Sequence, residues 1–386
     1  MGIYINIGNA GFRSARNGEY VDKSGLIAVV NGTLFTEHCF SCVTRCRRFG
    51  KSMAAKMLYA YYDHSCDSRS LFTDLEIAHH PSFEKHLNKY PTIFLDMTDF
   101  VYRYKGDDVV DKIDVALLAD VSKAYPDVLV EEGDCLMDYL LRVSETKQEQ
   151  FVFIIDEWDA ICREFAPDSK AMDAYVGWLK RMFKSQDAMR VFACAYMTGL
   201  LPIKKYQTES ALNNFQEYSM VTPRNMAPFF GFTKDEVRTL AAQYGMDFDE
   251  LVKWYDGYQI GEEMSMFNPN SVMFAFWSNY CSNNWWGTSS IHKFDDCIAN
   301  NYDGIYDELS RLFGGNHYKI DVTRFNSYVW GEIRSKDDML TAMIHFGYLT
   351  YNSTSGECYV PNSEVLGRLS SHVGSLLFRQ GGTVSV

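Results

Sequence analysis

The sequence has no apolar run approaching the ~18 residues that a helix needs to cross a bilayer. Its first six residues carry no basic segment followed by an apolar stretch, and position 6 lacks the hydroxyl of a myristoylation site, so neither a secretory signal nor N-myristoylation is predicted. Positive charge is scarce, since 37 Lys and Arg stand against 50 Asp and Glu, a net charge of −13. This balance argues against broad binding to nucleic acid or anionic membranes. We therefore expect a soluble, cytoplasmic protein with no membrane partner.

The chain also lacks a fixed-period repeat, a heptad array and a low-complexity tract, which excludes solenoid and coiled-coil folds. Its ten cysteines do not form the disulfide framework of a short secreted domain, because the chain has 386 residues. His38, Cys39, Cys42 and Cys46 have spacing that could suit a metal, but no second pair completes a tetrahedral site. Buried free thiols on a strand are the favoured interpretation.

What the sequence does contain is apolar: 47% of its residues are hydrophobic and 15% are aromatic, enough for the cores of two to three domains. Short apolar runs with the character of buried parallel strands lie at residues 38–44, 91–97, 151–155 and 190–197. The third run, Phe-Val-Phe-Ile-Ile, is apolar at every position, which is typical of a strand covered on both faces.

Helical patterns separate these runs, at residues 51–62, 107–124 and 170–184, each with an apolar stripe at helical spacing. Alternation of strands and helices predicts an α/β fold with a parallel central sheet. After about residue 225 the pattern becomes helical. Thr233-Lys234-Asp235-Glu236 is a capping box that starts one helix, Gly245 ends it, and a second short helix runs from Asp249 to Tyr255.

The C-terminal part combines a helix around residues 336–346, strands at 348–351 and 358–360 joined by a Ser-Thr-Ser-Gly turn, and a final helix at about 363–378. A helix with a hairpin resembles a winged-helix module, which can read DNA. Residues 330–386 hold only four Lys or Arg against five Asp or Glu, so a packing role is favoured over DNA binding. Nucleic acid is left open as a partner.

The strongest chemical signal is Arg47-Arg48-Phe49-Gly50-Lys51-Ser52, which lies between a predicted strand and an amphipathic helix. A phosphate-binding loop needs converging backbone amides at a helix start, a lysine for the β- and γ-phosphates and a hydroxyl for Mg²⁺. Gly50, Lys51 and Ser52 supply these groups. The usual pattern also has a glycine at position 45, where this chain has Arg45, so the match is incomplete.

A second signal comes from the strand at 151–155, which runs directly into Asp156-Glu157. This is the form of a Walker B element, in which Asp156 would hold the Mg²⁺ ion and Glu157 would activate the attacking water. The two features are independent and lie far enough apart for an intervening strand and its crossovers. Together they predict a nucleotide site.

Two further assignments have alternatives. Thr198 follows the strand at 190–197 and could sense the γ-phosphate or the attacking water, or it could simply close a turn. Arg47 and Arg48 have the forked geometry that suits phosphate. One of them is favoured for that role, and ion pairs with the acids of residues 156–159 are the alternative.

Nine motifs, in order along residues 20–365, resemble those of the bacterial AAA-ATPase-like family that is often fused to a C-terminal PD-(D/E)xK nuclease. The first five are Tyr20-Val21-Asp22-Lys23-Ser24, Arg45 to Ser52 (R-P-R-R-F-G-K-S in the family), Ile154 to Ala160 (I-D-E-Y-D-A), Thr198-Gly199-Leu200-Leu201-Pro202-Ile203 and Leu212-Asn213-Asn214-Phe215. The other four are Trp254-Tyr255-Asp256-Gly257-Tyr258, Phe267-Asn268-Pro269, Gly347-Tyr348-Leu349-Thr350 and Pro361-Asn362-Ser363-Glu364-Val365. Cys46 departs from the family proline.

The resemblance implies a P-loop NTPase core of the additional-strand type, with a further strand between the P-loop and Walker B strands. We expect this domain at residues 1–225, a helical lid-like domain at 226–300 and a winged-helix-like module at 301–386. No Asp…Glu-x-Lys set follows residue 365. Nuclease activity is therefore not expected from this chain.

The predicted function is Mg²⁺-dependent ATP binding and hydrolysis that drives a conformational switch. The expected catalytic residues are Glu157, Lys51 and Thr198, and the metal ligands are Ser52 and Asp156. The expected nucleotide-binding residues are Arg47, Arg48, Phe49, Gly50, Lys51, Ser52 and Met53. The alternative is a nucleotide-gated interaction module with little turnover, whose partner is another protein, a separate nuclease or a second copy of the chain.

Overall fold

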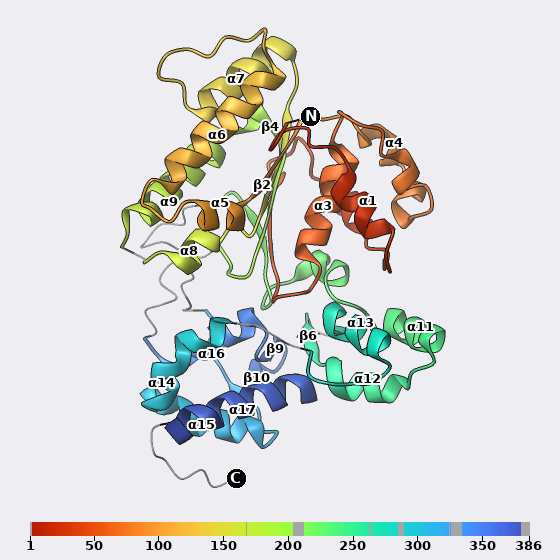
Figure 1. Ribbon diagram of the computed structural model, residues 1–386, viewed down its shortest axis with the longest axis vertical. Helices are drawn as coiled ribbons and strands as arrows, with labels where there is room; N and C mark the ends of the chain where they lie inside the picture. Colours follow the sequence, from red (N-terminus) through yellow and green to blue (C-terminus); the bar gives the residue numbers. More distant parts are fainter. Residues whose placement is uncertain are drawn as a thin grey trace. The chain divides into compact units, whose positions relative to one another are not determined.

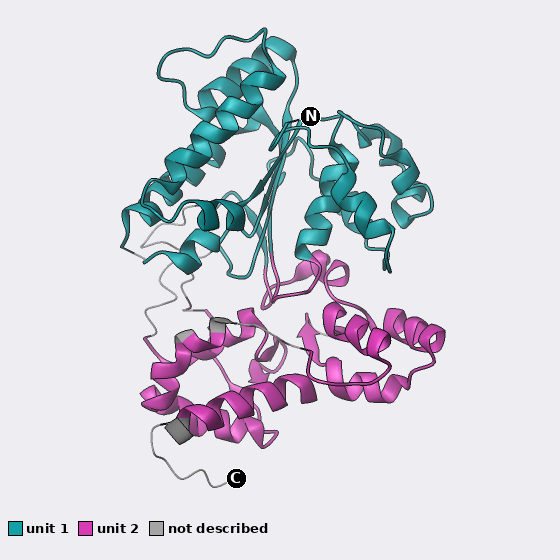
Figure 2. Ribbon diagram, viewed as in Figure 1, with its two compact units in different colours: residues 1–43, 51–218 teal, residues 44–50, 219–386 magenta. Residues whose placement is uncertain are grey.

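The computed structural model describes residues 2–166, 168–203, 212–261, 264–284, 289–323, 325 and 334–379. The chain divides into two compact units (Figure 2), and both are built from two stretches of sequence. The first unit comprises residues 1–43 and 51–218, and the second comprises residues 44–50 and 219–386. None of the helices in these described ranges combines the length and the apolar character required to cross a bilayer.

The first unit contains a five-stranded sheet in the order β2-β3-β4-β1-β5. Its strands are β1 (Phe40–Thr44), β2 (Thr92–Asp96), β3 (Phe151–Asp156), β4 (Phe192–Gly199) and β5 (Gln216–Tyr218). The pairings of β2 with β3, β3 with β4 and β1 with β5 are parallel. Because β4 lies between β1 and β3, the sheet has the additional strand that the resemblance implied.

Helices cover both faces of this sheet (Figure 1), with α3 against one face and α5 to α9 along the other. The helices of the first unit are α1 (Ala10–Arg16), α2 (Gly25–Asn31), α3 (Lys51–Tyr62), α4 (Phe83–His86), α5 (Met97–Arg103), α6 (Val109–Ala124), α7 (Leu136–Lys147), α8 (Ala160–Glu164), α9 (Lys170–Phe183) and α10 (Ala188–Val191), with 3₁₀ turns η1 (Arg69–Leu71) and η2 (Glu76–His79). Cover on both faces explains why every residue of β3 and β4 is buried.

The predicted strands and helices of this unit are confirmed to within two residues at most ends. Helix α3 begins at Lys51 and ends at Tyr62, as its apolar stripe indicated. Cys39, Cys42 and Cys46 are buried, as the favoured interpretation of that cluster expected. Strand β5 was not predicted, because its three residues, Gln216–Tyr218, include two polar side chains and carry no hydrophobic pattern.

The second unit is mainly helical, with two small antiparallel sheets. Its helices are α11 (Lys234–Tyr244), α12 (Phe248–Tyr255), α13 (Pro269–Ser278), α14 (Asp295–Ala299), α15 (Ile305–Phe313), α16 (Lys336–Phe346) and α17 (Ser363–Arg379), with 3₁₀ turns η3 (Arg224–Phe229), η4 (Ser289–Phe294) and η5 (Tyr302–Gly304). The sheets are β6 (Tyr258–Ile260) with β7 (Met264–Met266), and β8 (Tyr318–Lys319), β10 (Glu357–Tyr359) and β9 (Thr350–Asn352) in that order.

The capping box and the glycine stop predicted for the helix after residue 233 are both confirmed. The Thr233 hydroxyl accepts from the amide of Glu236 at 3.3 Å, and the Glu236 carboxylate accepts from the amide of Thr233 at 2.7 Å. Gly245 ends α11 in the left-handed conformation, with φ at 69°. Helices α11, α12 and α13 then pack around a shared apolar core that includes Val237, Leu251 and Phe276.

Candidate functional site

The site forms at the carboxyl edge of the sheet in the first unit. Asp156 is the last residue of β3, and Thr198 lies near the end of the neighbouring strand β4. The parallel register pairs Ile155 with Met197, so these two polar side chains are at the same level of adjacent strands. In an α/β fold, ligands bind at this edge, where the strands end and loops begin.

Three oxygen-bearing side chains meet there. The Thr198 hydroxyl donates to Oδ1 of Asp156, and the Ser52 hydroxyl, from the first turn of α3, also hydrogen-bonds to this carboxylate. Asp156 is only 3% exposed, and desolvation raises its pKa above the usual value, while the bonds from Thr198 and Ser52 act in the opposite direction. The structure thus brings together both predicted metal ligands and the predicted sensor.

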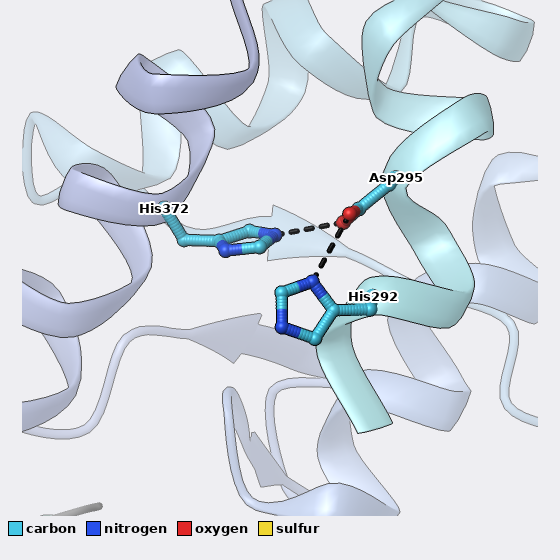
Figure 3. Close-up of side chains that lie close together, drawn as sticks. All are labelled: His292, Asp295 and His372. Carbon is cyan, nitrogen blue, oxygen red and sulfur yellow. Dashed lines mark hydrogen bonds and ion pairs between the residues drawn. The ribbon is translucent and has the colours of Figure 1, made fainter. Parts of the chain in front are cut away.

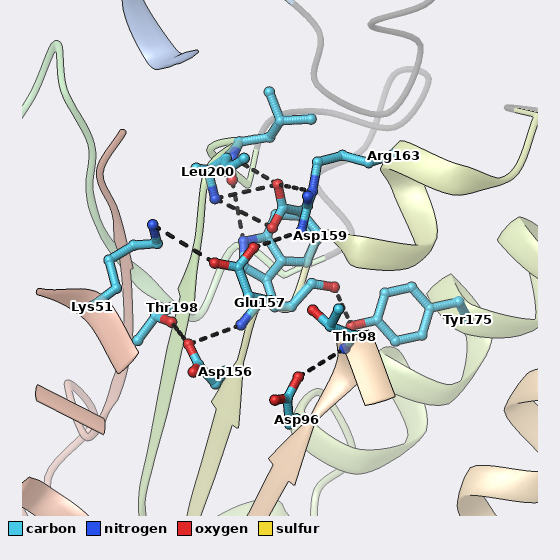
Figure 4. Close-up of polar contacts among 12 residues, drawn as sticks. Lys51, Asp96, Thr98, Asp156, Glu157, Asp159, Arg163, Tyr175, Thr198 and Leu200 are labelled. Atoms are coloured by element: carbon cyan, nitrogen blue, oxygen red, sulfur yellow. Dashed lines mark hydrogen bonds and ion pairs between the residues drawn. The ribbon is translucent and has the colours of Figure 1, made fainter. Parts of the chain in front are cut away.

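Glu157 extends from the next position of the chain into the space beside Lys51 (Figure 4). Its backbone has a positive φ of 54°, which is uncommon for a residue with a side chain and marks a sharp turn after β3. Its carboxylate Oε1 lies 3.7 Å from Nζ of Lys51, and its Oε2 accepts from Nη2 of Arg163 at 2.5 Å. Lys51 itself is buried, with 5% of its surface exposed.

Arg163, on α8, was missed by the sequence reasoning. Besides Glu157, it contacts Asp159, whose Oδ2 lies 3.2 Å from Nε of Arg163. Their i, i+4 spacing on a helix was the available signal. Asp159 is fully buried and also accepts from the amides of Leu200 and Leu201; desolvation raises its pKa, and the nearby guanidinium opposes that effect.

The turn after Thr198 is held closely against the loop after β3. The amide of Trp158 donates to the Thr198 carbonyl at 2.8 Å, and its indole donates to the Leu201 carbonyl at 3.1 Å. A Cβ at Gly199 would lie 2.6 Å from both the Asp159 carboxylate and the Trp158 ring. Position 199 therefore requires glycine for steric reasons, which accounts for the Thr-Gly pair noted in the sequence.

Residues 44–50, just before Lys51, belong to the second unit and contact other residues of that unit. Arg45, at the position of the missing glycine, is fully buried, donates to the Thr44 carbonyl and lies over the ring of Phe230. Nη1 of Arg48 donates to the Asn284 carbonyl at 2.9 Å. The Phe49 carbonyl accepts from the amide of Gly231 at 3.2 Å. The position that holds a glycine in the usual phosphate-loop pattern is thus occupied here by a buried side chain that packs within the second unit.

The other predicted binding residues are more open. Arg47 and Arg48 are half-buried, Gly50 is exposed, and Met53, on α3, has 40% of its surface exposed. Gly50 has a φ of 88° and nothing within 4 Å of a built Cβ, so its conformation, rather than crowding, requires glycine there. Arg163 already provides the guanidinium partner of Glu157 and Asp159, a role considered above for Arg47 and Arg48.

The donor set suits a nucleotide with its magnesium ion. Mg²⁺ prefers hard oxygen ligands, and Ser52 and Asp156 present a hydroxyl and a carboxylate in contact with each other. Lys51, as the first residue of α3, lies where the amides and dipole of a helix favour phosphate. These residues therefore fit the groups that the sequence pattern implied.

The sheet order, the Gly-Lys-Ser turn that enters α3 and the Asp-Glu pair after β3 define a P-loop NTPase fold of the additional-strand type. Residues 6–208, just over half of the chain, match the sequence profile of a family described as predicted AAA-ATPase. The chain belongs to this family, which implies a nucleotide-binding core.

A relative is an uncharacterized protein from the vnfD 5′ region of Azotobacter chroococcum mcd 1, 26% identical over 283 residues. The match covers 70% of this chain and 51% of the relative, so the chain spans about half the length of that protein. Among solved structures, the ORC2 protein of Aeropyrum pernix, in complexes with ADPNP and ADP, aligns over 93% of both chains with a TM-score of 0.32 and 10% identity. That likeness is too distant to carry an argument.

Proposed function

We propose that this protein is a Mg²⁺-dependent ATPase whose hydrolytic cycle drives a conformational switch. The observation that carries the proposal is the meeting of Ser52, Asp156 and Thr198 at the sheet edge, with Glu157 beside Lys51. Membership of the predicted AAA-ATPase family supports the same nucleotide chemistry.

In this proposal Lys51 and the amides of residues 49–52 bind the β- and γ-phosphates. Arg47, Arg48, Phe49, Gly50 and Met53 complete the nucleotide-binding segment. Ser52 and Asp156 hold Mg²⁺, which supplies charge neutralisation on the phosphate oxygens when bound. The buried position of Lys51 and Asp156 strengthens their electrostatic effect, because the local dielectric is low.

Glu157 accepts the proton of the attacking water in this scheme, and Thr198, which donates to Asp156, senses the γ-phosphate or that water. Both carboxylate oxygens of Glu157 are engaged, one by Lys51 and one by Arg163. Each oxygen keeps a further lone pair that can accept a proton, but the two cations favour the charged carboxylate. A phosphate group that attracts Lys51 away from Glu157 would release the carboxylate when substrate binds.

The switch is supported by the bonding of the loop before Lys51. Phe49 is bonded through its carbonyl to Gly231, and its ring packs edge-on against Tyr258, with centroids 5.0 Å apart. Both partners belong to the helical part that starts after residue 218. A displacement of the loop by phosphate would therefore alter contacts of residues 231 and 258, which we propose as the start of a lid-like response.

A second candidate function is a nucleotide-gated interaction module with little turnover. The two cations beside Glu157 favour it, since their positive charges disfavour transfer of a proton to this carboxylate. Its partner would be a protein, a separate nuclease or a second copy of the chain. The two candidates share the same nucleotide contacts and differ in whether Glu157 becomes available.

Phosphate release from ATP, with and without Mg²⁺, tests the proposal in the wild type beside Glu157→Gln. Removal of a general base is expected to lower turnover by roughly two to four orders of magnitude while nucleotide affinity is retained. Glu164→Gln, an exposed carboxyl on α8, is the matched control and should keep turnover. Equal turnover in wild type and Glu157→Gln would reject the role of Glu157. Binding without turnover in either would favour the gated module.

Lys51→Ala should weaken ATP binding by about tenfold or more, because a charge-assisted contact to phosphate contributes about 1.5–3 kcal/mol. Titration of a fluorescent ATP analogue measures the affinity. Lys56→Ala is the control, since Lys56 lies on the same helix and is exposed. Unchanged affinity in Lys51→Ala would contradict the assignment of the phosphate site. The same titration with a GTP analogue gives the base preference.

A further inference from the structure

The second unit contains a cluster of two histidines and an aspartate that has no part in the nucleotide chemistry. His292 is in turn η4, Asp295 starts α14, and His372 is on α17. Figure 3 shows both imidazole rings directed at the Asp295 carboxylate. Nε2 of His372 lies 2.7 Å from Oδ1, and Nδ1 of His292 lies 3.1 Å from Oδ2.

The three groups converge as metal ligands do. Among the residues that the structure describes, this is the one group of three His, Cys, Asp or Glu side chains whose ligand atoms all lie within 4.8 Å of one another. An ion with ligand distances of about 2.0–2.2 Å separates tetrahedral donors by about 3.4 Å. The observed separations of 2.7 and 3.1 Å are shorter than that value by about 0.7 and 0.3 Å, so the side chains must move apart by that much to admit an ion.

The surroundings also suit an ion with an open position. The His372 side chain is 9% exposed, Asp295 is 25% exposed and His292 is 61% exposed. One side of the cluster therefore faces solvent, which gives an entry path and room for a water ligand. His292 and Asp295 are three residues apart along a helical stretch, a spacing that places both side chains on one face.

A carboxylate that accepts hydrogen bonds from two imidazoles explains the same distances without an ion. The chain offers a simpler case for comparison, because Nδ1 of His317 lies 3.4 Å from Oε2 of Glu357, a pair of one imidazole and one carboxylate. The His292 cluster differs in bringing a third donor from a helix more than 70 residues away, with the two rings edge to face at a centroid distance of 5.0 Å. Convergence of three donors, two of them imidazole, is what a metal site requires.

We propose that His292, Asp295 and His372 bind a divalent transition-metal ion of the zinc class, with water as a fourth ligand. Imidazole nitrogen favours Zn²⁺, Co²⁺ or Ni²⁺, whereas Mg²⁺ prefers oxygen ligands. The site is thus chemically distinct from the one at Ser52 and Asp156. A bound ion would fasten α17 to α14 and stabilise the folded second unit by mass action.

Zn²⁺ titration of the full-length protein, stripped with chelator and held in excess Mg²⁺, tests the proposal by calorimetry. We expect one site in the wild type and at least about a tenfold loss of affinity in both His372→Gln and Asp295→Asn, since each removes one of three ligands. His317→Gln, which disrupts the His317–Glu357 pair, should bind Zn²⁺ as the wild type does. Circular dichroism checks that each variant is folded, and Asp295→Asn keeps the shape of the side chain if His372→Gln fails that check.

Co²⁺ absorption separates this site from the ten cysteines, because thiolate ligands give intense charge-transfer bands that imidazole and carboxylate do not. A visible Co²⁺ spectrum without thiolate bands, lost in His372→Gln, would support the proposal. Thiolate bands, equal affinity in all variants, or no Zn²⁺ binding by the wild type would overturn it. None of these readouts depends on ATP turnover.

Discussion

At the scale of single residues, the carboxylate of Glu157 contacts two cations, Lys51 and Arg163, which have different further partners. Lys51 has a second candidate partner in phosphate. Arg163 is tied to Asp159 as well as to Glu157, and Asp159 is fully buried. We infer that Arg163 has a structural role that Lys51 does not share, namely compensation of a buried negative charge.

Arg163→Gln is therefore expected to lower the free energy of unfolding by about 3 kcal/mol or more, because it leaves the Asp159 carboxylate buried without its cation. Chemical denaturation of the purified variant measures the change. Arg190→Gln is the matched control, since Arg190 also pairs with two carboxylates, Glu145 and Asp187, but at exposed positions. That control should cost less than about 1 kcal/mol. Equal costs for the two variants would contradict the compensating role of Arg163.

At the scale of secondary-structure elements, α11 shows how strongly local sequence defines a helix. Its start has reciprocal bonds between Thr233 and Glu236, and its end is the left-handed Gly245. The helix buries Val237 and Ala241 fully and packs Leu240 and Tyr244 against the same core, and its two caps add to the stability that this packing provides. Such a helix should respond measurably to the loss of one cap.

Thr233→Ala should reduce the stability of the second unit by about 1 kcal/mol, because the amide of Glu236 loses its acceptor. The control is Thr239→Ala, an exposed position in the middle of the same helix, where alanine is the better helix former and a small gain is expected. Thermal unfolding followed by circular dichroism compares the two. A loss of equal size at both positions would show that the cap itself contributes nothing.

The elements that could be predicted are those whose signals are local. Strand β3 was evident because all its residues are apolar, and α3 because its stripe begins at the Gly-Lys-Ser turn. Strands β5 and β8 could not be predicted, because they have three and two residues and gain their structure from pairing with β1 and β10. Short strands are set by their neighbours rather than by their own pattern.

In the candidate site, too, residues in local motifs could be predicted and residues brought together by the fold could not. Lys51, Ser52, Asp156 and Glu157 stand in short contiguous motifs and were identified directly, although their assigned roles remain proposals. Arg163 was not, since its contact with Glu157 depends on the turn after β3 and on the placement of α8. The His372 donor lies 77 residues from Asp295, so no spacing rule indicates that the two meet.

At the scale of the whole molecule, the stability of the second unit should depend on pH through Glu364. This side chain is fully buried at the start of α17 and accepts from the amide of Asn284 at 2.7 Å. Burial raises its pKa from 4.5 to about 7, against the opposing effects of Asn284, Ser271 and Arg48. The folded protein therefore holds a proton that the unfolded chain has released between these two pH values.

Because the folded state binds more protons in this window, stability falls as pH rises from about 4.5 to about 7 and stays lower above it. Glu364→Gln removes this titration and should gain up to about 3 kcal/mol over the wild type at pH 8, with little difference at pH 4.5. Denaturation across this range measures the difference. Glu250→Gln, exposed on α12, controls for the loss of one charge. A difference that does not vary with pH would contradict the prediction.

The seven residues 44–50 pack with a unit whose remaining sequence begins only at Ser219. During synthesis, residues 44–50 leave the ribosome well before the residues from 219 onward with which they pack. A ribosome-bound nascent chain that ends near residue 218 would hold every strand of the central sheet, while the segment leading into α3 would still lack its packing. Packing of residues 44–50 is thus tied to completion of the C-terminal half.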